Sequence, residues 1–192
     1  MATFDRGFKS WAERTSANIR NELGLAPHDS LDVFKVAEFL DVTVKTPTDI
    51  PGLPDDVLDQ LARKDPFGWH AVSLILPDGW TLLIYNPKKS VGRKASDISH
   101  ELAHIIMEHK PSTVILSQDG SFAMRTYDQK QEDEANWLAW SLLLPREALI
   151  RAMRQGKSIE DTAASYGVST QLVNYRLGVT GVSAQLSRMR RK

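Results

Sequence analysis

Apolar positions recur at helical spacing near the start of the chain. Phe8, Trp11 and Ile19 share one face of a helix predicted over residues 8–23, and Gly24 follows as a favoured C-cap residue. A second helix comes next, with Asp29 or Ser30 as its expected N-cap. Its apolar positions are Leu31, Phe34, Val36, Ala37 and Leu40, and it leads into a short strand, Val42–Lys45. The Pro- and Asp-rich segment Thr46–Pro66 predicts a loop with a short helix over 55–63.

Two apolar runs rich in β-branched residues, within WHAVSLILPDGWTLLIYNP, predict a β-hairpin. Its turn is Pro77, Asp78 and Gly79, because proline presets one backbone dihedral and glycine accepts a positive φ. A helix over 96–109 follows, with Ser96 as its expected N-cap and Pro111 just beyond its end.

The rest of the chain is predicted to be mainly helical. The segment TVILSQDGSF, residues 113–122, is expected to add a short strand. A strong helix over Glu132–Leu144 ends at Pro145. Residues 158–181 then have the outline of a helix-turn-helix with Gly167 at the turn. These elements indicate an α+β chain with a small antiparallel or mixed sheet. We divide the chain into two parts, residues 1–150 and the helical C-terminal part, residues 151–192.

The composition indicates the class of protein and limits which residues could bind a metal. Hydrophobic residues make up 42% of the chain and charged residues 25%, as in an ordinary soluble globular protein. No apolar run approaches membrane-spanning length and the first residues are polar, so a cytoplasmic location and no membrane contact are expected. The chain has no cysteine, so any metal must be held by His, Asp or Glu.

The segment SDISHELAHIIMEH contains the order His-Glu-x-x-His at His100, Glu101 and His104. Helical residues four apart lie about 40° apart around the axis, so both imidazoles can point at one cation. The Glu of this motif reaches the water on the metal and can act as a general base. The alternative is an amphipathic helix that carries two histidines by chance. An apolar face on the same helix favours the metal site, because buried histidines need partners. This face is formed by Ile98, Leu102, Ile105 and Ile106.

A third ligand is sought on another helix that faces the core. Glu132 shares a helical stripe with Ala135 and Ala139, whereas Glu134 lies about 200° away around the axis. We therefore favour Glu132 over Glu134 as the ligand. Asn136, one turn after Glu132, is a candidate hydrogen-bond partner for one of the imidazoles.

The segments ISHELAHIIMEH and EDEANWLAWSLLLP resemble the ImmA/IrrE family of zinc metallopeptidases. Leu138 and Leu144 replace a Phe and a Met of the family pattern, each an apolar-for-apolar change. The resemblance implies a zincin-like fold, Zn²⁺ bound by His100, His104 and Glu132, and Glu101 as the catalytic base. It further implies a protein substrate, such as a transcriptional repressor or another regulator. In zincins an edge strand beside the active-site helix holds an extended substrate, and Trp80–Asn86 is our candidate for it.

The C-terminal part is basic, with eight basic and two acidic residues over 151–192, against 16 and 22 over 1–150. In the predicted helix-turn-helix, the second helix is expected to expose Gln171, Asn174, Tyr175 and Arg176. Because only one of these is cationic, DNA contact through this part should be weak. Packing of these helices on the peptidase is the other interpretation.

Two hypotheses for function follow. The first is a zinc peptidase that cleaves a specific protein partner. The second is a DNA-binding or partner-docking regulator whose metallopeptidase-like part does not hydrolyse anything. The complete set of His, Glu, His and Glu favours the first, since a binding module needs no general base beside its metal.

Overall fold

The computed structural model describes residues 4–64, 66–76, 79–110, 114–116, 123–125 and 128–189. The helices are α1 (Phe8–Glu22), α2 (Val33–Phe39), α3 (Asp55–Asp59), α4 (Val91–Ile106), α5 (Gln129–Leu143), α6 (Arg146–Arg154), α7 (Ile159–Tyr166), α8 (Thr170–Val179) and α9 (Val182–Met189). The strands are β1 (Val42–Lys45), β2 (Ala71–Ile75), β3 (Thr81–Tyr85), β4 (Val114–Leu116) and β5 (Ala123–Arg125). Short turns of 3-10 and π helix occupy Pro47–Asp49 and Gln60–Lys64. The expected α+β class is confirmed.

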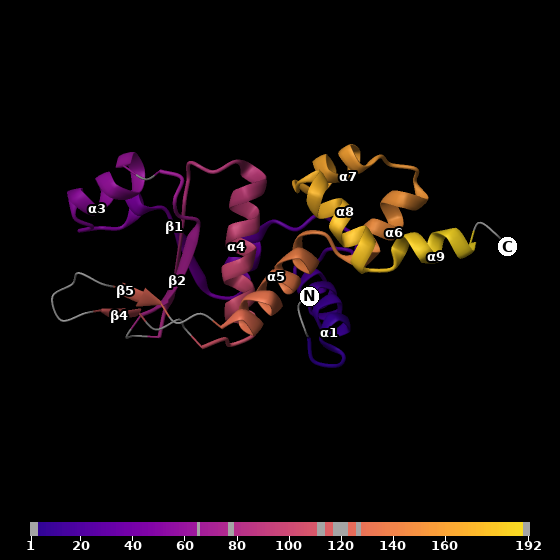
Figure 1. Cartoon of the computed structure of the whole chain (residues 1–192), viewed down its shortest axis with the longest axis horizontal. Helices are drawn as coiled ribbons and strands as arrows, with labels where there is room; N and C mark the ends of the chain where they lie inside the picture. Colours follow the sequence, from indigo (N-terminus) through magenta and orange to yellow (C-terminus); the bar gives the residue numbers. More distant parts are fainter. Residues whose placement is uncertain are drawn as a thin grey trace.

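The sheet lies on one side of α4, and the helices α6 to α9 lie on the other side (Figure 1). The strand order of this three-stranded sheet is β1-β3-β2, with β3 parallel to β1 and antiparallel to β2. The expectation that Trp80–Asn86 is an edge strand is therefore wrong, because β3 is the central strand and β1 and β2 are the two edges. The hairpin was visible in the sequence, but the pairing of β1 with β3 joins distant segments and leaves no local signal. The predicted turn residues Pro77 and Asp78 lie outside the described residues.

Two helices begin at caps other than those expected. Ser90 caps α4, since its hydroxyl accepts a hydrogen bond from the Arg93 N–H, so the helix starts before Ser96. Asp32 caps α2 by accepting from the Phe34 N–H. In each case the chain offers more than one residue of capping type before the apolar run, and the sequence does not show which of them is the N-cap.

Buried apolar side chains form two clusters. The larger one joins α1, α2, β1, β3, α4 and α5, and the smaller one joins α6 to α9 with Leu144. Val168 packs against both clusters. Helix α6 spans the division at 150 and 151, and its Leu149 and Ile150 belong to the smaller cluster. The two-domain division stays a proposal.

A buried arginine attaches the C-terminal helices to the rest of the chain. Arg176 is fully buried, with its guanidinium paired to Glu13 and donating to the Leu144 carbonyl. The expectation that Arg176 is exposed is therefore wrong: it faces inward one turn after Leu172, whereas its neighbour Tyr175 is exposed. The ring of Tyr175 still packs edge-on against Trp140, with centroids 4.8 Å apart.

The turn between α7 and α8 contacts the first turn of α4. A Cβ atom added at Gly92 would lie 2.9 Å from the carbonyl oxygen of Gly167. Gly167 itself has a φ of 62°, in the left-handed region that glycine adopts without strain. Only glycine at position 92 allows this close approach.

None of the described helices has the length and apolarity needed to cross a bilayer.

Candidate metal centre and active site

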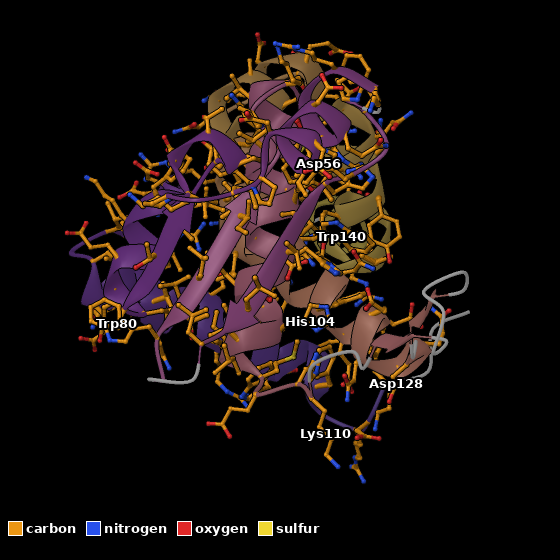
Figure 2. The ribbon with its side chains drawn as sticks, turned by 90° about the vertical axis from the view of Figure 1, so that its left-hand side faces the viewer. Asp56, Trp80, His104, Lys110, Asp128 and Trp140 are labelled. Carbon is orange, nitrogen blue, oxygen red and sulfur yellow. The ribbon has the colours of Figure 1, made fainter. Side chains whose placement is uncertain are left out.

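Two imidazoles from α4 and one carboxylate from α5 converge where these helices pack together. The His100 Nε2 atom lies 3.1 Å from the His104 Nε2 atom and 3.1 Å from the Glu132 Oε2 atom. The His104 Nε2 atom lies 3.7 Å from the Glu132 Oε1 atom. Figure 2 shows His104 on α4 beside the ribbon of α5. All three side chains are about a fifth exposed, so water can reach them.

The donor set fits a tetrahedral metal. Bonds of about 2.0–2.1 Å place neighbouring ligand atoms of a tetrahedron roughly 3.3–3.4 Å apart. The observed separations of 3.1 to 3.7 Å lie on either side of that value. Among the described residues, His100, His104 and Glu132 are the group whose ligand atoms all fall within 4.8 Å of one another. Glu134, the alternative considered from the sequence, does not join this group.

The packing of the two helices explains this convergence. Asp128 caps α5 by accepting hydrogen bonds from the N–H groups of Lys130 and Gln131, so Glu132 falls in the first turn. The contact face of both helices is apolar and buried. Ile98, Leu102 and Ala103 of α4 and Ala135, Leu138 and Ala139 of α5 are buried in the same apolar cluster. Glu132 lies one turn before Ala135 on α5, and its carboxylate meets His100 and His104 of α4.

Glu101 faces the sheet. Its Oε2 atom accepts hydrogen bonds from the backbone N–H of Ser73, at 2.9 Å, and from the Ser73 hydroxyl, at 2.6 Å. These two bonds come from one residue of β2 and use one of the two carboxylate oxygens. They hold the carboxylate in one orientation next to the histidine pair. Ser73 was not singled out from the sequence, because nothing local links it to a residue 28 positions away.

The edge of β2 beside α4 has backbone groups that do not point toward β3. The Leu76 N–H donates to the Trp80 carbonyl, and the His70 carbonyl accepts from the Asn86 N–H. Even-numbered residues of this strand therefore pair with β3, and by alternation Ala71, Ser73 and Ile75 direct their N–H and carbonyl groups away from it. The bond from the Ser73 N–H to Glu101 agrees with this alternation.

His109 contacts His104 on the side of the ring away from His100 and Glu132. Its Nδ1 atom lies 3.0 Å from the His104 Nδ1 atom, and its Nε2 atom lies 3.5 Å from Glu134 Oε2. Burial lowers the pKa of His109, and the nearby Glu134 carboxylate opposes this shift. No hydrogen bond joins Asn136 to either imidazole among the contacts of the described residues, so its role stays a prediction. His109 fills this place for His104, and the sequence alone had suggested no role for it.

The sequence profile of the Peptidase_M78 family, described as the IrrE N-terminal-like domain, matches residues 61–178, which is more than half of the chain. The chain belongs to the Peptidase_M78 family. This membership confirms the resemblance to the ImmA/IrrE family and supports a metallopeptidase-like regulator domain. The matched region of this Peptidase_M78 chain contains His100, Glu101, His104 and Glu132.

A Mycobacterium tuberculosis transcriptional regulator has a similar structure, with a TM-score of 0.54 and 19% sequence identity. The similarity covers 91% of this chain and 47% of the regulator, so the chain spans about half the length of that protein. At this identity the likeness shows the fold alone, and it agrees with the zincin-like α+β arrangement of the Peptidase_M78 chain. A search of curated proteins finds no match to this sequence.

Proposed function

We propose that this chain is a cytoplasmic zinc-dependent peptidase that hydrolyses a peptide bond in one specific protein partner, a transcriptional repressor or another regulator. His100, His104 and Glu132 bind the zinc, and Glu101 is the general base. The observation that carries this proposal is the convergence of three donors, 3.1 to 3.7 Å apart, beside a carboxylate that Ser73 holds in place.

Zinc is the metal that suits these ligands. Two imidazoles and one carboxylate are a common ligand set of catalytic zinc, and three protein ligands leave one position for water. The absence of cysteine agrees with this set, since thiolates belong mostly to structural zinc sites. When bound, zinc supplies Lewis acidity that activates water and polarises the scissile carbonyl.

One side chain, Glu101, then moves the proton. Glu101 accepts it from the attacking water and passes it to the nitrogen of the leaving amine. The two hydrogen bonds from Ser73 prevent the carboxylate from rotating, so the base is positioned before the substrate arrives. Glu132 and the histidines contribute no proton transfer in this scheme and serve as ligands.

An extended substrate would pair with the outer edge of β2. Ala71 and Ile75 direct N–H and carbonyl groups outward on either side of Ser73, so a peptide strand added there would run alongside α4. Leu74 and Ile75 are exposed, at 43% and 68%, although large apolar residues on a sheet edge usually require protection. A substrate strand would provide that protection.

The replacement Glu101→Gln tests this proposal. The variant keeps the size of the side chain and loses its basicity, so it should bind zinc, melt like the wild type and cleave candidate regulators at least ~100-fold more slowly. His104→Ala is the second variant, and it should lose zinc as well as cleavage. Zinc content is measured by elemental analysis, and cleavage by intact-mass spectrometry. Cleavage by Glu101→Gln at the wild-type rate would refute the proposed base.

A non-hydrolytic regulator is the second candidate. The structural neighbour is named a transcriptional regulator, and the basic balance of residues 151–192 is favourable for DNA. The burial of Arg176 weighs against direct DNA binding by α8, because the helix loses the one cation expected on its outer face. This candidate predicts that regulation persists in Glu101→Gln, whereas the peptidase proposal predicts that it is lost.

A further inference from the structure

We infer that His109 and Glu134 are positioning residues, which fix the tautomer and ring orientation of His104 so that its Nε2 atom is presented to the metal. This inference rests on the proposed function, since it concerns the same metal site. Neither residue is a ligand or touches the reacting atoms.

The contact between His104 and His109 involves the ring nitrogen of His104 that faces away from the proposed ligand cluster. The His104 Nε2 atom faces His100 and Glu132. Its Nδ1 atom, on the other side of the ring, lies 3.0 Å from His109 Nδ1. The rings are nearly perpendicular, at 70°, with centroids 5.0 Å apart, which is edge-on contact and not stacking. His109 therefore lies behind the ligand and not among the ligands.

Hydrogen-bond polarity then assigns the protons. A metal-binding His104 needs a lone pair on Nε2, so its single proton must be on Nδ1. That N–H donates to His109 Nδ1, which must accept and therefore carries its own proton on Nε2. The Nε2–H faces the Glu134 carboxylate at 3.5 Å. With these protons, each donor faces an acceptor. If His109 Nδ1 donated to His104 Nδ1 instead, the proton of His104 would be on Nε2, the atom that binds metal.

The backbone holds this arrangement in place. Glu108 has a φ of 52°, which reverses the chain just after α4 and returns His109 toward the helix. The His109 N–H donates to the His104 carbonyl at 3.0 Å, so the two residues are linked through backbone as well as side chain. The side chains of His109 and Glu134 are 9% and 14% exposed. Glu132 thus lies at the Nε2 side of the His104 ring, and Glu134, from the same helix, reaches the Nδ1 side through His109.

The test is zinc affinity, measured by competition with a chromophoric chelator at fixed pH. His109→Ala should weaken zinc binding by about 10–100-fold, the usual effect of removing a partner of a metal-binding histidine. His109→Gln should recover part of the loss, because its amide oxygen can accept from His104 Nδ1–H. Glu134→Ala should cause a smaller loss than His109→Ala. His28→Ala is the matched control, since it removes a histidine beside Arg151, away from the site, and should leave zinc affinity unchanged.

A packing role for His109 gives a different result. It would lower the melting temperature of the metal-free protein while zinc affinity stayed at the wild-type value, and this outcome would overturn the inference. Equal affinities for His109→Gln and His109→Ala would also overturn it, since orientation by an acceptor would not matter. A wild-type protein that binds zinc but cleaves no partner would refute the proposed peptidase activity and leave the positioning role intact.

Discussion

The hydrogen bonds between Ser73 and Glu101 connect the sheet edge to the proposed chemistry through one residue. The Ser73 N–H and hydroxyl both donate to Glu101 Oε2, and the same strand provides the edge where a substrate would pair. A shift of β2 would therefore move the base and the substrate together. Such coupling keeps the geometry between them constant, which is what positioning for catalysis requires.

Replacing Ser73 by alanine removes the hydroxyl bond and keeps the backbone bond. A hydrogen bond to a charged group contributes about 1.5 kcal/mol, and ~1.4 kcal/mol corresponds to a tenfold change in rate. Ser73→Ala should therefore lower kcat about tenfold, with zinc content unchanged. Ser73→Thr, which keeps the hydroxyl and suits a strand, is the control and should stay near the wild-type rate. Equal rates for the two variants would show that the hydroxyl does not position Glu101.

At the scale of elements, the sequence predicted the parts that depend on local pattern. Val42–Lys45 forms β1 as expected, α1 and the hairpin strands lie where the periodicity placed them, and Gly167 ends α7 at the predicted turn. His100, His104 and Glu132 were found because spacing along a helix determines which side chains share a face. That these three residues bind metal stays a prediction.

The features that were missed depend on tertiary contacts. The central place of β3 and the bond from Ser73 to Glu101 join elements that the sequence does not relate. His109 is only five residues from His104, but their contact depends on the positive φ of Glu108, which the sequence pattern did not indicate. The inward orientation of Arg176 is of the same kind, since a charged residue is assigned to the surface unless its buried partner, here Glu13, is known. Periodicity reports which residues share a face and leaves open what that face meets.

The contact between α4 and the turn before α8 can be tested with two glycines. Gly92→Ala would place a Cβ atom 2.9 Å from the Gly167 carbonyl oxygen, a backbone atom that cannot move alone, so we expect a loss of about 1–3 kcal/mol in the free energy of unfolding. Gly178→Ala in α8 is the control, because its Cβ would meet no atom within 4 Å. It should be neutral or stabilising by up to about 1 kcal/mol. Both are measured by urea denaturation, and equal stabilities would show that the contact does not constrain α4.

At the scale of the whole molecule, α4 and α5 connect the candidate metal site to the C-terminal helices. Helix α4 carries His100 and His104 and meets Gly167 at its other end, while α5 carries Glu132 and is followed by Leu144, whose carbonyl accepts from Arg176. The two core clusters meet at Val168. These links predict that the chain unfolds as one cooperative unit, although it contains two clusters.

Metal removal tests this cooperativity. Zinc at 1,000 times its dissociation constant stabilises the folded state by about 4 kcal/mol, and each kcal/mol raises the melting temperature by about 2–4 °C in a chain of this size. Saturating zinc should thus raise the wild-type melting temperature by roughly 8–16 °C, chelation should reverse the rise, and His104→Ala should show almost none. Scanning calorimetry should record a single transition that shifts as a whole, because α4 and α5 transmit the stabilisation to both clusters. If only part of the heat absorption moved with zinc and a second transition stayed in place, the C-terminal helices would be an independent unit and the division near residue 150 would be a true domain boundary.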